Sequence, residues 1–82
     1  MTTQESERRS KVLMSVFGLT HAEARVALAL LETRDIKGAA VQCGITVGSA
    51  RQYLKRVFSK SNTTGQVDLV ITLMNLLLSQ VE

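Results

Sequence analysis

Apolar residues recur at helical spacing in four consecutive segments, and we expect these to form helices over residues 20–33, 36–43, 47–60 and 66–80. No segment alternates β-branched or aromatic residues with polar ones in the manner of strands. The chain also contains no proline and only three aromatic residues. The pattern therefore predicts an all-α fold of four helices.

Residues suited to helix ends stand between these segments. Thr20 and Glu23 have the spacing of a capping box, in which each side chain accepts a hydrogen bond from the other residue's backbone N–H. Asp35 and Thr46 are expected to be N-caps of the next two helices, and Gly44 and Asn62 are expected to end them in the left-handed conformation. A helix of about eight residues, a tight turn over residues 44–46 and a longer basic helix make the layout of a helix-turn-helix motif.

The N-terminal segment carries weaker signals. Val12, Leu13 and Val16 indicate a short apolar lead-in that packs on the domain, whereas residues 1–10 are polar and expected to fray. We therefore divide the chain into a partly flexible lead-in, residues 1–16, and one domain, residues 17–82.

Composition excludes several classes of protein. Eighty-two residues, 45% of them hydrophobic, provide one small core and are too apolar for a disordered tail. A single cysteine, Cys43, and a single histidine, His21, exclude a disulfide scaffold and a four-ligand zinc site. No arrangement typical of catalysis or phosphate binding is present, so neither an enzyme nor a cofactor is expected. No apolar run reaches the ~20 residues of a membrane span and no signal peptide is seen, so we expect a cytoplasmic, nucleoid-associated protein without membrane contact.

Charge is distributed unevenly along the chain. Residues 36–67 contain five of the ten basic residues and none of the seven acidic ones. The other residues carry the remaining five basic residues against all seven acidic residues. Either a solvated cationic surface or a polyanionic partner would account for this segment, and nucleic acid is the commonest such partner.

An ordered set of short motifs at fixed spacing resembles the LuxR/GerE-type helix-turn-helix domain, in a Leu-Thr-x-Ala-Glu-Ala-Arg variant common in alphaproteobacterial regulators. The matching residues run without a gap from about 17 to 77: Phe17-Gly18-Leu19-Thr20, Glu23-Ala24-Arg25-Val26, Ala39-Ala40, Gly44-Ile45-Thr46, Ala50-Arg51, Leu54-Lys55-Arg56-Val57-Phe58, Lys60 and Gln66-Val67-Asp68-Leu69-Val70. The chain departs from the usual family residues at Thr33, Cys43, Ser49, Tyr53 and Asn62. The resemblance implies a four-helix LuxR/GerE-type fold that binds DNA.

The expected third helix has two distinct faces. Ala50, Leu54 and Val57, together with Phe58, fall on a side that must face the core. The opposite side and its flanks carry donors on a helix narrow enough for the major groove, about 12 Å wide. Arg51, Gln52 and Lys55 are the candidates for reading base edges, and the resemblance implies base contacts at the same positions. The candidates for phosphate contacts are Lys37, Thr46, Ser49, Tyr53, Arg56 and Lys60.

Two other residues have alternative interpretations. Glu23 is either the capping-box partner of Thr20 or the partner of a basic residue in the third helix. Cys43 is interpreted as a small buried hydrophobic residue.

The last helix has more apolar residues than one core-facing stripe requires. Val67, Val70, Ile71, Met74, Leu77, Leu78 and Val81 form one stripe, which is expected to cover the core. Leu69, Leu73 and Leu76 form a second group, which is expected to pair with a second copy across a two-fold axis. The resemblance implies dimerisation through this helix. The alternative is a face for RNA polymerase or a separate regulator protein.

These observations predict a sequence-specific regulator of transcription that binds double-stranded DNA as a homodimer, with the helix over residues 47–60 in the major groove. The alternative is an interaction module that forms heterodimers with a larger regulator of the same family and titrates it. The chain is interpreted either as a short stand-alone regulator or as the C-terminal part of a longer one.

Overall fold

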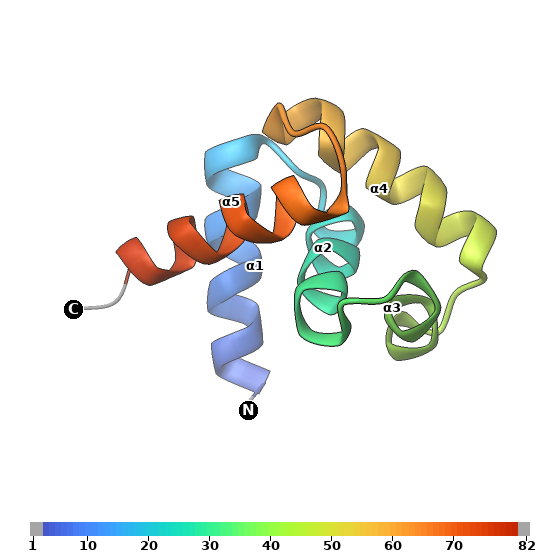
Figure 1. Ribbon diagram of the computed structural model, residues 1–82. Coiled ribbons are helices and arrows are strands. Elements are labelled where there is room, and N and C mark those ends of the chain that lie inside the picture. The colour runs from blue at the N-terminus through green and yellow to red at the C-terminus, as the bar shows by residue number, and fades with distance from the viewer. Residues whose placement is uncertain (1–2, 81–82) are drawn as a thin grey trace.

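The computed structural model describes residues 3–80, with no strand among them. They form five helices: α1 (Thr3–Phe17), α2 (His21–Thr33), α3 (Ile36–Cys43), α4 (Val47–Ser61) and α5 (Gln66–Ser79) (Figure 1). The expectation of an all-α fold is confirmed. The four expected helices correspond to α2–α5, with ends that agree to within about a residue.

The prediction that the polar N-terminal segment frays was wrong for the described residues, because Thr3–Phe17 is one continuous helix. The prediction that the apolar part packs on the domain is confirmed at Leu13. Leu13 is fully buried, Ser10 is buried, and Met14 and Phe17 pack against the core. These four positions repeat at helical spacing, so the polar residues around them belong to the solvent side of an amphipathic helix. Glu5 and Arg9 form an ion pair one turn apart (3.3 Å), which adds about 0.2–0.5 kcal/mol to such a helix. The part of the predicted lead-in at residues 1–2 lies outside the described residues.

The predicted helix ends are confirmed. Both bonds of the capping box form: Thr20 N donates to Glu23 Oε1 (3.0 Å), and Glu23 N donates to Thr20 Oγ1 (3.2 Å). Asp35 and Thr46 accept bonds from the N–H groups of Gly38 and Ser49, so they cap α3 and α4. Gly44 and Asn62 end these helices with φ of 70° and 57°. Arg34 also ends α2 in the left-handed region, with φ of 58°, which the sequence pattern did not indicate.

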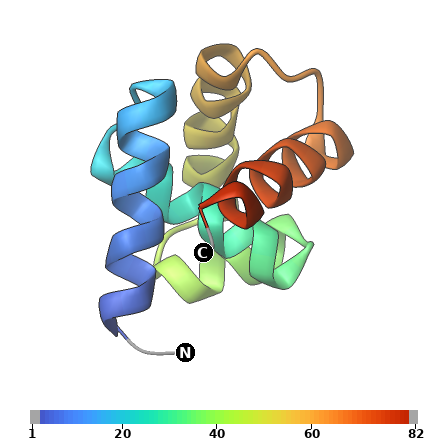
Figure 2. The same ribbon diagram turned by 90° about the vertical axis from the view of Figure 1, so that its left-hand side faces the viewer.

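The core is built around α2, which contacts all four other helices (Figures 1 and 2). The fully buried leucines Leu13, Leu54 and Leu69 come from α1, α4 and α5 respectively. In Figure 2, α1 and the end of α5 lie nearest the viewer, with α4 behind them. α4 and the surface formed by α1 and α5 therefore lie on different sides of the molecule.

The turn between α2 and α3 depends on a close approach at Gly38. A Cβ at this position would lie 2.9 Å from Cβ of Thr33, at the end of α2. Thr33 itself is held in place, because its hydroxyl lies between the carbonyl oxygens of Ala29 (2.8 Å) and Asp35 (2.9 Å) and can donate to either of them. The absence of a side chain at residue 38 thus allows α3 to fold back on α2.

The expected assignment of faces on α5 was wrong for the predicted dimer face and for most of the predicted core stripe. Val70 is buried and Leu77 packs against the core as expected, and Val81 lies outside the described residues. Leu69 and Leu73 were predicted to lie in a dimer interface, but each has 0% of its surface exposed within one chain. Leu76 is partly buried and packs against the same core. The exposed face instead carries Val67 (74% exposed), Ile71 (53%), Met74 (40%) and Leu78 (66%). Leu69 and Leu73 belong to the buried core cluster, and Gln66 Nε2, at the start of the helix, donates to the carbonyl oxygen of Arg34 (2.8 Å).

In the described part of the chain, no single helix combines the length and apolarity needed to cross a membrane. Residues 4–17 and 21–33 meet that criterion only together, as a pair bent by 115°.

Candidate nucleic-acid interface

The geometry of α4 separates a buried side from an exposed side. Ala50, Leu54, Val57 and Ser61 are buried at intervals of three or four residues, as a core-facing stripe requires. The Ser61 hydroxyl donates to the carbonyl oxygen of Val57 (2.7 Å), so the polar group in this stripe is satisfied. The buried stripe fixes which side chains of α4 point to solvent.

Arg51, Gln52 and Lys55 are all exposed on α4. Among residues 3–80, none of these three side chains makes a hydrogen bond or an ion pair. They lie within about one helical turn of one another, so their donors are directed over one patch of surface. Within residues 3–80, no group accepts a hydrogen bond from the guanidinium, amide and ammonium donors of this patch.

The candidate phosphate-binding residues differ in how they are placed. Lys37 and Arg56 are exposed and make no ion pair in the described chain. Thr46 and Ser49 are joined by a hydroxyl–hydroxyl bond (3.1 Å) at the start of α4. Tyr53 is half-buried and packs against the core, which leaves only part of its ring accessible.

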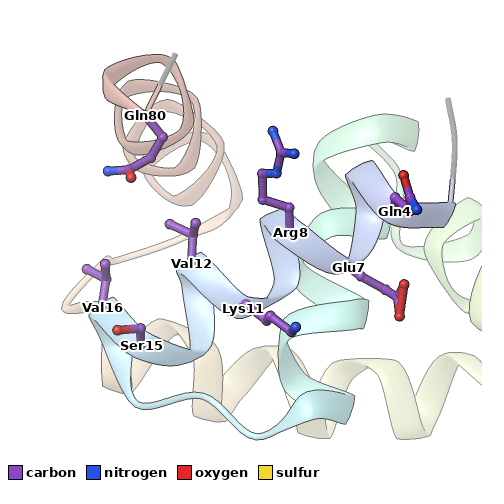
Figure 3. A pocket seen from close by; sticks show the side chains of 8 residues that line it. All are labelled: Gln4, Glu7, Arg8, Lys11, Val12, Ser15, Val16 and Gln80. Carbon is purple, nitrogen blue, oxygen red and sulfur yellow. The ribbon is translucent and has the colours of Figure 1, made fainter. Parts of the chain in front are cut away.

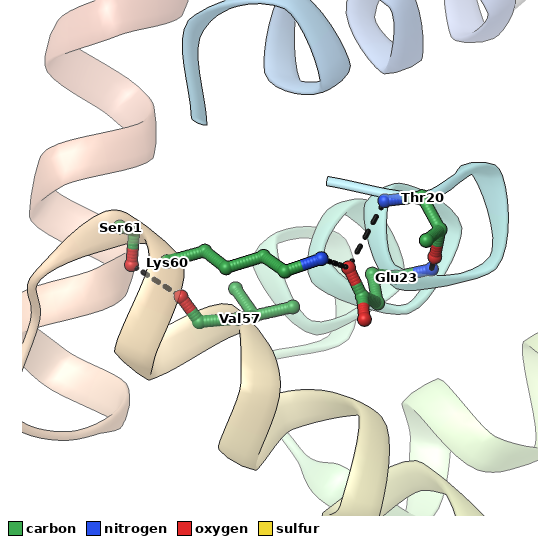
Figure 4. Close-up of polar contacts among 5 residues, drawn as sticks. All are labelled: Thr20, Glu23, Val57, Lys60 and Ser61. Carbon is green, nitrogen blue, oxygen red and sulfur yellow. Dashed lines mark hydrogen bonds and ion pairs between the residues drawn. The ribbon is translucent and has the colours of Figure 1, made fainter. Parts of the chain in front are cut away.

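Lys60 is exposed, but its ammonium is paired with a carboxylate of α2. Its Nζ donates to Oε1 of Glu23 (2.8 Å), and the same oxygen accepts the backbone N–H of Thr20 (Figure 4). Both interpretations of Glu23 therefore hold together, since it completes the capping box and pairs with α4. The Lys60 hydrogen bond is the largest cause that lowers the pKa of Glu23, followed by the Thr20 N–H, while burial acts in the opposite direction. With its charge neutralised in this way, Lys60 is a weaker phosphate-binding candidate than Arg56.

The N-terminus of α4 is open to the outside. Gly48 is exposed, and a Cβ added there would meet only Thr46 Oγ1, at 3.9 Å. The first backbone N–H groups of a helix carry partial positive charge and bind anions. A phosphate backbone can therefore approach this end of α4 closely.

Cys43 is half-buried, as a small hydrophobic residue beside the core, and its Sγ donates to the carbonyl oxygen of Arg25 (3.7 Å). Burial raises the pKa of this thiol, which keeps it protonated at neutral pH. No cluster of three histidine, cysteine or acidic residues suited to a metal ion occurs among the described residues.

Comparisons with protein-family models, with curated proteins and with solved structures found no match. The similarity to LuxR/GerE domains therefore rests on the residues of the chain itself.

Proposed function

We propose that this protein is a sequence-specific DNA-binding regulator of transcription of LuxR/GerE type, with α4 as its recognition helix. The observation that carries the proposal is the exposed patch of Arg51, Gln52 and Lys55, whose donors have no partner in the described chain. It lies in the segment, residues 36–67, that has no acidic residue. Exposed donors without a protein partner on the outer face of the second helix of a helix-turn-helix motif are suited to base edges in the major groove.

Each residue has a distinct role in this proposal. Arg51 and Lys55 are suited to guanine O6 and N7, and Gln52 to adenine N6 and N7. Arg56, Lys37 and the capped start of α4 would bind phosphates, which set the register of the protein on the duplex without reading sequence.

We further propose that the protein binds DNA as a homodimer, through a face of α5 different from the predicted one. Val67 and Ile71 are exposed and four residues apart, which places them on one stripe of the helix. An exposed apolar stripe of this kind can pair with its own copy across a two-fold axis. Val67 and Ile71 are the most direct candidates for this contact.

Selection of binding sites from a pool of random duplex DNA tests the proposal. We expect enrichment of one sequence arranged as two symmetric half-sites, and binding that weakens as salt concentration rises. The matched control is the triple variant Arg51→Ala/Gln52→Ala/Lys55→Ala, which changes only exposed side chains and is expected to keep its helical circular dichroism. Absence of enrichment with folded protein at low salt would overturn the proposal.

A further inference from the structure

On the side formed by α1 and α5, the chain has a second surface where apolar side chains are exposed. A groove of about 610 Å³ runs between these helices and the end of α2. Its apolar residues are Val12, Leu31, Met74, Leu77 and Leu78. Leu78 and Met74 are 66% and 40% exposed, so the groove holds apolar surface that one chain leaves in water.

The rim of this groove is mostly cationic. Arg8, Arg9 and Arg34 line it together with one acidic residue, Glu5, which pairs with Arg9. A neighbouring hollow of about 530 Å³ shares Arg8, Val12 and Gln80 with the groove and adds Lys11 and Glu7. Figure 3 shows Arg8 and Val12 on the side of α1 that faces α5, with Gln80 directed toward α1. Apolar surface with a net positive rim is complementary to apolar residues flanked by carboxylates.

Arg34 is fixed in position over this groove. Its Nε donates to the carbonyl oxygen of Leu31 (2.9 Å), and its Nη2 contacts Sδ of Met74 (3.7 Å). Its backbone has φ of 58°, a region that residues other than glycine rarely adopt. A guanidinium held in this way loses little conformational freedom when it binds a carboxylate.

From these observations we propose that the groove between α1 and α5 binds an acidic amphipathic helix of a partner protein. An apolar groove between two helices has no open strand edge, so a helix that lays its apolar face between them is the suitable form of ligand. A second copy of this groove is a poor occupant, because it would bring Arg8 and Arg34 against their own copies. The proposal does not depend on DNA binding, since α4 lies on another side of the molecule (Figure 2).

The test uses synthetic peptides of about 18 residues, long enough to form a helix on the surface. The first carries leucines at helical spacing flanked by glutamates, the second has lysine for every glutamate, and the third has serine for every leucine. We expect fluorescence anisotropy to show that the first binds at least about tenfold more tightly than the others. Backbone amide shifts in nuclear magnetic resonance spectra should change around Val12, Leu77 and Leu78.

Two arginine variants with the same change of charge provide the matched comparison. Arg8→Glu should weaken binding of the acidic peptide about fivefold, whereas Arg25→Glu, an exposed position on α2 outside the groove, should change it less than twofold. Leu78→Ser, also at an exposed position, should weaken binding without unfolding the chain.

Several outcomes would overturn the proposal. Equal binding of the glutamate and lysine peptides, or equal losses in Arg8→Glu and Arg25→Glu, would mean that the rim does not select for acid. Binding of vesicles of anionic phospholipid in the absence of peptide binding would make the groove a membrane contact. The groove would instead belong to a second copy of the chain if the original protein bound none of the peptides and sedimentation showed that Leu78→Ser converts a dimer to a monomer.

Discussion

Lys60 and Glu23 form an ion pair of 2.8 Å that joins the last turn of α4 to the first turn of α2. The Glu23 side chain is 3% exposed and that of Lys60 is 37% exposed, so the carboxylate is buried while the ammonium remains at the surface. The same carboxylate oxygen also accepts the Thr20 N–H. One acidic group therefore ties the last turn of α4 to the first turn of α2, at the centre of the fold.

Replacement of Glu23 by Gln should make the protein less stable at neutral pH and less sensitive to acid. Gln keeps the capping geometry but loses the charge, so we expect a loss of about 1–2 kcal/mol in the free energy of unfolding at pH 7. The pKa of Glu23 is lowered in the folded state from its ordinary value of 4.5. Its contribution is thus fully present well above pH 4.5 and is lost as the pH falls toward the lowered pKa.

Urea unfolding at pH 7 and at pH 4 measures this difference. The stability gap between Glu23→Gln and the original chain should narrow at the lower pH. Glu7→Gln, at an exposed position of α1, should leave stability unchanged at both pH values. A gap that widens toward low pH would contradict the assigned role of Glu23.

Arg51 and Arg56 should affect DNA binding in different ways. Arg51→Ala should cost about 1–3 kcal/mol on the selected site and relax the preference at one base pair. Arg56→Ala should weaken binding to all sequences alike and reduce the slope of affinity against salt by about one. Titration of selected and random duplexes at several salt concentrations separates the two effects, and identical behaviour of the two variants would refute the division into reading and positioning residues.

Gly48→Ala should stabilise the protein and weaken its binding to DNA. The added methyl group meets only Thr46 Oγ1 at 3.9 Å, and alanine favours the helix over glycine by about 0.5–1 kcal/mol. The same methyl group would lie at the exposed start of α4, where we expect the duplex to approach. Thermal unfolding and duplex titration of one protein sample test both effects, and unchanged affinity would place the duplex away from this end of α4.

Gly38→Ala should have the opposite effect on stability. Its new Cβ would lie 2.9 Å from Cβ of Thr33, so α3 must shift or the side chain must be strained. Overpacking of this kind costs about 1–3 kcal/mol, which exceeds the gain in helix propensity. Chemical denaturation measures this loss of stability. The control is Gly48→Ala, which places the same methyl group in open space. Equal changes in stability for the two variants would show that the α2–α3 contact is looser than described.

Substitutions at Leu73 and Ile71 should affect different properties, the first the stability of the fold and the second the association of two chains. Leu73→Ala removes fully buried methyl groups and should cost about 2–5 kcal/mol of stability. Ile71→Glu changes a residue that is 53% exposed, so the chain should stay folded but sediment as a monomer and bind a single half-site only weakly. An Ile71→Glu protein that still forms the original dimer would move the interface elsewhere on the surface.

The sequence by itself determined most of the helix boundaries, because these depend on local chemistry. Thr20, Asp35 and Thr46 cap helices by accepting bonds from the amides three residues further on, and Gly44 adopts a left-handed conformation at little cost. The exposure of Arg51, Gln52 and Lys55 also followed from periodicity, since Ala50, Leu54 and Val57 left α4 only one side to bury. The sequence pattern of α1 was less clear, because its apolar residues are confined to residues 12–17 and the preceding residues 3–11 are all polar.

Only the tertiary structure decided which apolar face of α5 is buried. Val67, Leu69, Ile71 and Leu73 are similar in hydrophobicity, so the order of residues does not distinguish a core side from an exposed side. The choice depends on how the helix is rotated, and contacts with residues distant in the sequence set this rotation, among them the bond from Gln66 to Arg34. The contacts of Lys60 with Glu23 and of Arg34 with Met74 depend in the same way on helix packing, because the paired residues are 37 and 40 positions apart in the chain.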